Sequence, residues 1–152
     1  MRDFEKFCKQ LEKMSYDDLL KFAGEKYGSC LRALAQVTDG DVKKASAALT
    51  ICAMAAASVD GKFAEGEYYH IAGLINATAG TEETSYEEAK ALIEKTVPMK
   101  DSGSDFVETI YLTIAKVDVD AAVDLIFFLA AICAADGDVC WKERSWLKKI
   151  YK

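Results

Sequence analysis

The sequence predicts an all-α protein, a compact bundle of seven to nine helices forming a single domain over residues 1–152. Apolar residues recur at helical spacing along almost the whole chain, and no stretch of alternating polarity competes with that pattern. The chain has one proline and nine glycines, too few for the many turns of an all-β protein. A chain of 152 residues can bury roughly two thirds of its unfolded surface, so one core suffices.

Three helices are expected before residue 42. Their apolar faces are formed by Phe4, Phe7, Cys8, Leu11 and Met14 in the first, Leu19, Leu20, Ala23 and Tyr27 in the second, and Leu31, Leu34 and Thr38 in the third. Ser15 is a good capping residue for the start of the second helix, and Asp18 suits its first turn. Gly28 is expected to end the second helix, since glycine favours the C-terminal cap. The turn residues 39–41, Asp-Gly-Asp, should end the third.

Three more helices are expected in the middle of the chain. Residues 42–59 are rich in alanine and have a thin polar face, so this helix should be central and buried, ending at Asp60-Gly61. A fifth helix should run from about residue 65 to 78. Ser85 and Glu88 match a capping box that opens a sixth helix, which Pro98 should end near Thr96.

The last part of the chain predicts a seventh, an eighth and a ninth helix. The apolar face of the seventh helix contains Phe106, Ile110, Ile114 and Val117. That of the ninth contains Trp146, Leu147 and Ile150. Asp118 can cap the eighth helix, whose apolar run covers residues 121–135 and is interrupted by Asp124. That run is too short to span a bilayer and is interpreted as a buried core helix.

Charge and cysteine content narrow the classes of function. The net charge is −6 and the isoelectric point about 4.9, which disfavours nucleic acid as a partner and favours a divalent cation or a basic protein. The N-terminus is charged and unlike a signal peptide, and no transmembrane segment is expected. Five cysteines without a C-x-x-C pair indicate reduced core residues and a cytoplasmic protein.

The most informative feature is an internal repeat, with copies over about 42–75 and 118–151. Residues 49–75 align with residues 125–151 without a gap, at an offset of 76 residues. Five aligned pairs are identical: Leu49 and Leu125, Ala55 and Ala131, Asp60 and Asp136, Gly61 and Gly137, Glu67 and Glu143. Each copy reads as helix, Asp-Gly turn and helix. Two such hairpins can pack about a pseudo-twofold axis, which would bring equivalent residues together.

Both copies share the pattern D-G-x-Φ-x-x-x-E, which resembles the second half of an EF-hand loop. The upstream ligand positions of an EF-hand are poor in both copies, and an EF-hand is excluded: they hold Ala56 and Ser58, and Ile132 and Ala134. A purely structural interpretation is a good alternative. Asp-Gly is a common turn sequence, and the negative charge of a glutamate in the first turn of a helix interacts favourably with the helix dipole.

Two buried helices, each followed by this motif, in an acidic helical domain of this length resemble the tellurite-resistance TerB-like family. The helical domain of certain membrane-anchored J-domain co-chaperones is similar. The resemblance implies an all-α bundle with an acidic divalent-metal site where the hairpins meet, and no established catalytic activity. By motif match the ligands are Asp60, Glu67, Asp136 and Glu143. It also implies a stress-response or tellurite-resistance role, with a protein partner in a complex near the inner membrane.

Other chemistries have weaker support in the sequence. Glu67 and His70 form one E-x-x-H element, but a di-iron centre needs two, and Trp146 stands at the place that matches His70. We therefore expect a non-catalytic domain that binds Ca²⁺ or Mg²⁺, since both prefer oxygen ligands. The alternatives are a metal-free protein-interaction module with an acidic surface and, less favoured, a metal-dependent hydrolase.

Overall fold

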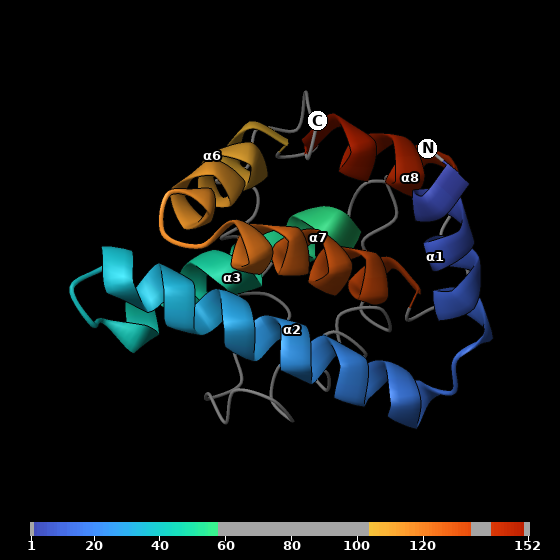
Figure 1. Cartoon of the computed structure of the whole chain (residues 1–152), viewed down its shortest axis with the longest axis horizontal. Helices are drawn as coiled ribbons and strands as arrows, with labels where there is room; N and C mark the ends of the chain where they lie inside the picture. Colours follow the sequence, from blue (N-terminus) through green and yellow to red (C-terminus); the bar gives the residue numbers. More distant parts are fainter. Residues whose placement is uncertain (1, 58–103, 135–140, 151–152) are drawn as a thin grey trace.

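A computed structural model of the chain describes residues 2–57, 104–134 and 141–150, and within these residues it contains helices and no strand (Figure 1). The described helices are α1 (Arg2–Lys13), α2 (Tyr16–Val37), α3 (Val42–Ala57), α6 (Ser104–Ala115), α7 (Val119–Ala134) and α8 (Trp141–Ile150). The all-α prediction is thus confirmed. The helices expected over residues 65–78 and 85–96 lie outside the described residues.

The helix α7 is the centre of the bundle. It packs against each of the five other described helices, and in Figure 1 it crosses the middle of the molecule between α6 and α2. From Phe128 to Ala134 every residue is buried, as expected for the apolar run. Burial on all sides removes the need for a polar face, which explains why this segment lacks one. No described helix is long and apolar enough to cross a membrane.

The structure corrects the prediction of two separate helices between Ser15 and Thr38. These residues form the single 22-residue helix α2, and Gly28 lies in its interior instead of at an end. The buried stripe of α2 continues past the glycine without a break: Leu19, Ala23, Tyr27, Cys30 and Leu34. Each lies three or four residues from the next, so all face α7 and α3. Packing of this continuous stripe outweighs the low helix propensity of one glycine.

We expect Gly28→Ala to raise the free energy of unfolding by about 0.5–1 kcal/mol, because alanine loses less backbone entropy in a helix interior. A Cβ at this position would lie 3.6 Å from the Arg32 guanidinium, an ordinary contact with a flexible side chain. Urea unfolding measures the change. Gly40→Ala is the control. Gly40 has φ of +82°, a conformation that alanine adopts poorly, so this variant should be less stable than the wild type. Loss of stability in Gly28→Ala would contradict the continuous helix.

The predicted helix starts at Ser15 and Asp118 and the predicted turn after α2 are confirmed, whereas the start predicted at Ser85 lies outside the described residues. The Ser15 hydroxyl accepts a hydrogen bond from the Asp18 amide at 3.2 Å and caps α2. The Asp118 carboxylate accepts from the amides of Asp120 and Ala121 and caps α7. Asp39 and Gly40 both have positive φ, so the backbone leaves the helical conformation where the Asp-Gly-Asp sequence predicts a break.

Candidate functional site

Of the four carboxylates predicted to bind metal, the structure describes one, Glu143. Glu143 lies in the first turn of α8 and is only 5% exposed. Asp60, Glu67 and Asp136 lie outside the described residues, as does His70. A buried carboxylate is costly unless its charge is compensated, so Glu143 is an unusual residue for a short surface helix. Glu143 is buried, whereas a glutamate whose only role is to interact with the helix dipole is usually exposed.

The sequence of α8 explains why Glu143 points inward. Glu143, Trp146, Leu147 and Ile150 lie three or four residues apart and all are buried, whereas Lys142 and Lys149 are exposed. The apolar residues anchor the helix against α6 and α7, and Glu143 shares their side. Trp146 is buried, as expected for a residue on the apolar face of the last helix, although its indole Nε1 donates no hydrogen bond to the described residues.

The first helices of the two repeat copies, α3 and α7, meet at their C-terminal ends. The thiol of Cys133 donates a weak hydrogen bond to the carbonyl oxygen of Ala56, with an Sγ–O distance of 3.8 Å. At the offset of 76 residues Cys133 corresponds to Ala57, so nearly equivalent positions of the two copies are in contact. In Figure 1 both helices run from left to right. The helices α3 and α7 therefore end side by side.

Four cysteines behave as the sequence predicts, whereas Cys140 lies outside the described residues. Cys8, Cys30, Cys52 and Cys133 are free and buried. Burial raises the pKa of the Cys8 thiol to about 11 and that of Cys30 to about 12, and it raises the pKa of Cys52 further. Thiols that stay protonated are poor nucleophiles and poor metal ligands, so these three residues do not suit cysteine-based catalysis.

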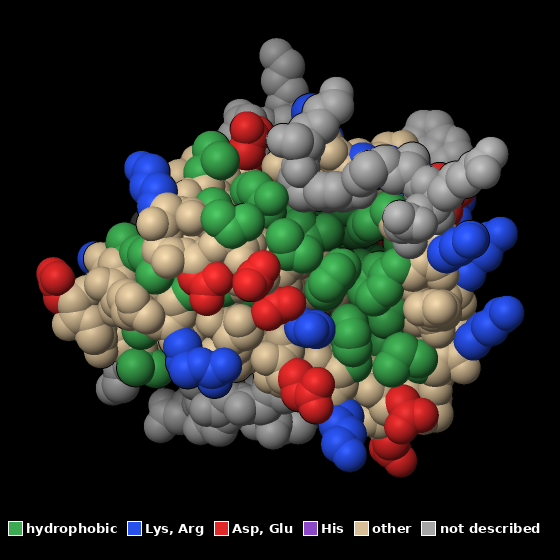
Figure 2. Space-filling model, in the orientation of Figure 1, with side chains coloured by type: hydrophobic (Ala, Val, Ile, Leu, Met, Phe, Trp, Pro, Cys, Tyr) green, Lys and Arg blue, Asp and Glu red, His purple; other side chains and the backbone are tan. Residues whose placement is uncertain are grey.

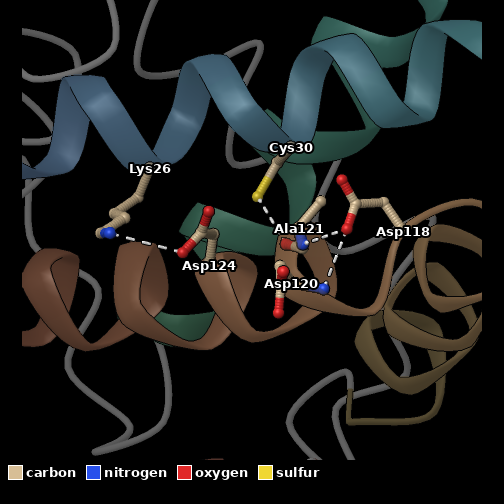
Figure 3. Close-up of polar contacts among 6 residues, drawn as sticks. All are labelled: Lys26, Cys30, Asp118, Asp120, Ala121 and Asp124. Atoms are coloured by element: carbon tan, nitrogen blue, oxygen red, sulfur yellow. Dashed lines mark hydrogen bonds and ion pairs between the residues drawn. The ribbon is translucent and has the colours of Figure 1, made fainter.

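A group of polar contacts joins α2 to the first half of α7 (Figure 3). The ammonium of Lys26 lies 3.4 Å from a carboxylate oxygen of Asp124, and the Cys30 thiol donates to the carbonyl of Ala121 at 3.4 Å. The Lys26 Nζ also lies 5.5 Å from the ring centroids of both Phe22 and Phe127. Attraction to a carboxylate and to two ring faces holds this cation against the protein surface.

The contacts between Lys26, Asp124 and the two phenyl rings were not predicted from the sequence. Asp124 interrupts an apolar run, and its spacing of four residues from Asp120 indicates an acidic stripe on one side of the helix. The partner Lys26 could not be inferred, because it is 98 residues away in the chain. Among the described residues, no three histidine, cysteine, aspartate or glutamate side chains come together as a metal site would require.

Within its described part, the protein is a helical bundle with a buried glutamate, Glu143, and without a group of three potential metal-ligating side chains. The sequence model of the family described as "Tellurite resistance protein TerB" matches residues 43–152, which is more than half of the chain. The chain therefore belongs to the TerB family. No curated protein and no solved structure matches it. The match begins at the start of α3 and includes both repeat copies, whereas α1 and α2 precede it.

Proposed function

We propose that this TerB-family chain is a non-catalytic binding domain that holds a divalent cation, Ca²⁺ or Mg²⁺, through Asp60, Glu67, Asp136 and Glu143. The observation that carries the proposal is the contact between the C-terminal ends of α3 and α7. Asp60 follows Ala56 by four residues and Asp136 follows Cys133 by three. The chain extends at most about 3.6 Å per residue, so both Asp-Gly pairs are only a few residues of chain away from this contact.

The burial of Glu143 is the second support. Several carboxylates held close together repel one another unless a cation or protonation relieves the repulsion. A donor set made of carboxylate oxygens fits the hard cations Ca²⁺ and Mg²⁺ better than Zn²⁺, which prefers nitrogen and sulfur. Bound to the cation, the domain would act as an adaptor for a partner protein in the stress response that gives tellurite resistance. Family membership supports the tellurite-resistance part of this role.

Thermal unfolding in chelator and in millimolar Ca²⁺ or Mg²⁺ tests the cation site. The wild type should gain about 2.7 kcal/mol at an ion concentration a hundredfold above Kd, by mass action. A variant with all four candidate ligands neutralised should gain nothing: Asp60→Asn, Glu67→Gln, Asp136→Asn and Glu143→Gln. A control with the same change in net charge neutralises exposed acids instead: Asp17→Asn, Asp39→Asn, Asp41→Asn and Glu108→Gln.

The control variant should keep the full response to the ion. If the wild type melts at the same temperature in chelator and in ion, the cation site is wrong. If the wild type does not respond and the neutralised variant is more stable in chelator, the acids form a repulsive cluster without an ion. That result would favour the metal-free interaction module. If neutralisation changes stability by only about 0.3–1 kcal/mol per helix start, the acids are structural caps.

A further inference from the structure

We propose that the exposed side of the first half of α7 is a docking surface for a basic amphipathic helix of a partner protein. We call this surface the α7 face; it consists of Val119, Asp120, Val123, Asp124 and Phe127. The proposal does not depend on the cation site, since it uses none of the four candidate ligands.

The exposure pattern of α7 marks the face. From Phe128 to Ala134 the helix is buried on every side, whereas Val119 is 65% exposed and Val123 is 37% exposed. Valine favours burial, and two exposed valines on the central helix of the core are not explained by packing within the described part of the chain. In Figure 1, α7 runs between α6 and α2 on the side that faces the reader. The α7 face therefore lies where another chain can reach it.

Helical spacing arranges the face in two parallel stripes. Val119, Val123 and Phe127 are four residues apart and follow one line along the helix, about 12 Å long at 1.5 Å per residue. Asp120 and Asp124 follow a second line beside it. Figure 2 shows hydrophobic side chains extending across this side of the molecule, with acidic side chains next to them between α7 and α2.

The apolar stripe continues into an aromatic cluster at its end. The Phe127 ring lies 4.6 Å from the Phe7 ring and 6.5 Å from the Phe22 ring, centroid to centroid. All three rings are half-buried, and they come from α7, α1 and α2. Partly exposed aromatic side chains in a rigid setting are frequent anchors of protein interfaces. This aromatic cluster therefore forms the apolar part of the docking surface at the Phe127 end.

Charge complementarity identifies the chemistry of the occupant. Asp118, Asp120 and Asp124 place three carboxylates within seven residues of the chain, on a molecule of net charge −6. Lys26 already shows how this face receives an ammonium, because its Nζ contacts Asp124 and lies over two phenyl rings. Asp120 lies one turn before Asp124 and is exposed, so it can receive a partner's lysine or arginine in the same way.

The shape of the apolar stripe favours a helix as that occupant. Side chains of an amphipathic helix at positions i, i+4 and i+8 repeat at the same interval as Val119, Val123 and Phe127, so the two rows can interdigitate. Lysine or arginine beside the apolar row of the partner would then meet Asp120. An anionic lipid surface or a nucleic acid would be repelled by the same carboxylates.

Binding of a designed probe peptide tests the proposal. The probe is a fluorescein-labelled helical peptide of leucine, alanine and lysine, with leucines at positions i, i+4 and i+8 and lysines beside them. A peptide of the same composition in shuffled order is the control for charge alone. Fluorescence anisotropy is measured in chelator, so that failure of the cation site cannot affect the result.

The variants are chosen as matched pairs. Val119→Ser with Asp120→Asn changes the first two residues of α7, both exposed. Val42→Ser with Asp17→Asn makes the same changes elsewhere, because Val42 is the first residue of α3 and is 52% exposed, and Asp17 is the second residue of α2. The α7 pair should weaken binding of the probe about tenfold, and the control pair less than about twofold.

Each of three outcomes would overturn the proposal. The probe could fail to bind the wild type, the shuffled peptide could bind equally well, or the two variant pairs could weaken binding equally. Light scattering on the wild type and the α7 pair supplies a further check. If the wild type is a dimer that the α7 pair converts to a monomer, then a second copy covers the face, and the proposed partner is wrong.

Discussion

Phe128→Ala is expected to lower the free energy of unfolding by about 3–5 kcal/mol, the largest effect of any single substitution considered. The Phe128 side chain is completely buried on α7, and its ring lies edge-to-face with Tyr27 at a centroid distance of 5.3 Å. Truncation would remove the apolar contact and leave a cavity where α2 meets α7. A domain of this size has about 5–15 kcal/mol of total stability, so the variant should unfold at much lower urea concentration.

Leu112→Ala is the control for Phe128→Ala. Leu112 is 52% exposed on α6, so its truncation should change stability by no more than about 0.5 kcal/mol. Equilibrium urea unfolding followed by circular dichroism at 222 nm measures both variants. A loss below about 1 kcal/mol for Phe128→Ala would show that α7 is not the centre of a closely packed core.

A rise from pH 8 to pH 10 is expected to cost the wild type roughly 2–3 kcal/mol through Cys30 and Cys52 alone. Burial raises the pKa of both thiols above the ordinary value of 9.0, to about 12 for Cys30. A group whose folded-state pKa is raised gives its full stabilisation below the unfolded-state pKa. The stabilisation is lost as the pH rises toward the folded-state pKa, because only the unfolded chain then releases the proton.

The double variant Cys30→Ala, Cys52→Ala separates this effect from other titrations. The variant should be less stable than the wild type at pH 7, because two buried side chains are shortened. Its loss of stability between pH 8 and pH 10 should be smaller by about 2–3 kcal/mol, since the two thiols no longer titrate. Urea midpoints at each pH give the two slopes. Parallel slopes for wild type and variant would mean that both thiols are accessible to water in the folded state.

Local sequence was enough to predict most of the described fold. The period of the apolar residues predicted α1, α3, α6, α7 and α8, and capping chemistry at Ser15 and Asp118 located two helix starts. These features depend on neighbours within one or two helical turns, so a single sequence contains all that is needed to infer them. The burial of the alanine-rich helix α3 and of the apolar helix α7 could also be predicted from the sequence, because neither has a polar face wide enough to face solvent.

The candidate site was predictable only in part. The alignment of residues 49–75 with residues 125–151 selected four acids at matching sequence positions, and the structure adds that Glu143 is buried and that α3 and α7 end in contact. Asp60, Glu67 and Asp136 lie outside the described residues, so their proximity to Glu143 stays a prediction. Equivalence in a repeat indicates which residues correspond. It does not set the distance between them, which depends on how the two hairpins pack.

Tertiary packing decided the features that sequence reasoning missed. Gly28 carries the local preference of a helix end, but the stripe from Leu19 to Leu34 gains more from packing against α3 and α7 than one glycine costs. Lys26 and Asp124 are 98 residues apart and meet only because α2 lies along α7. Residue type and spacing determine a helix and its faces, whereas the choice of which face meets a partner depends on contacts between distant segments.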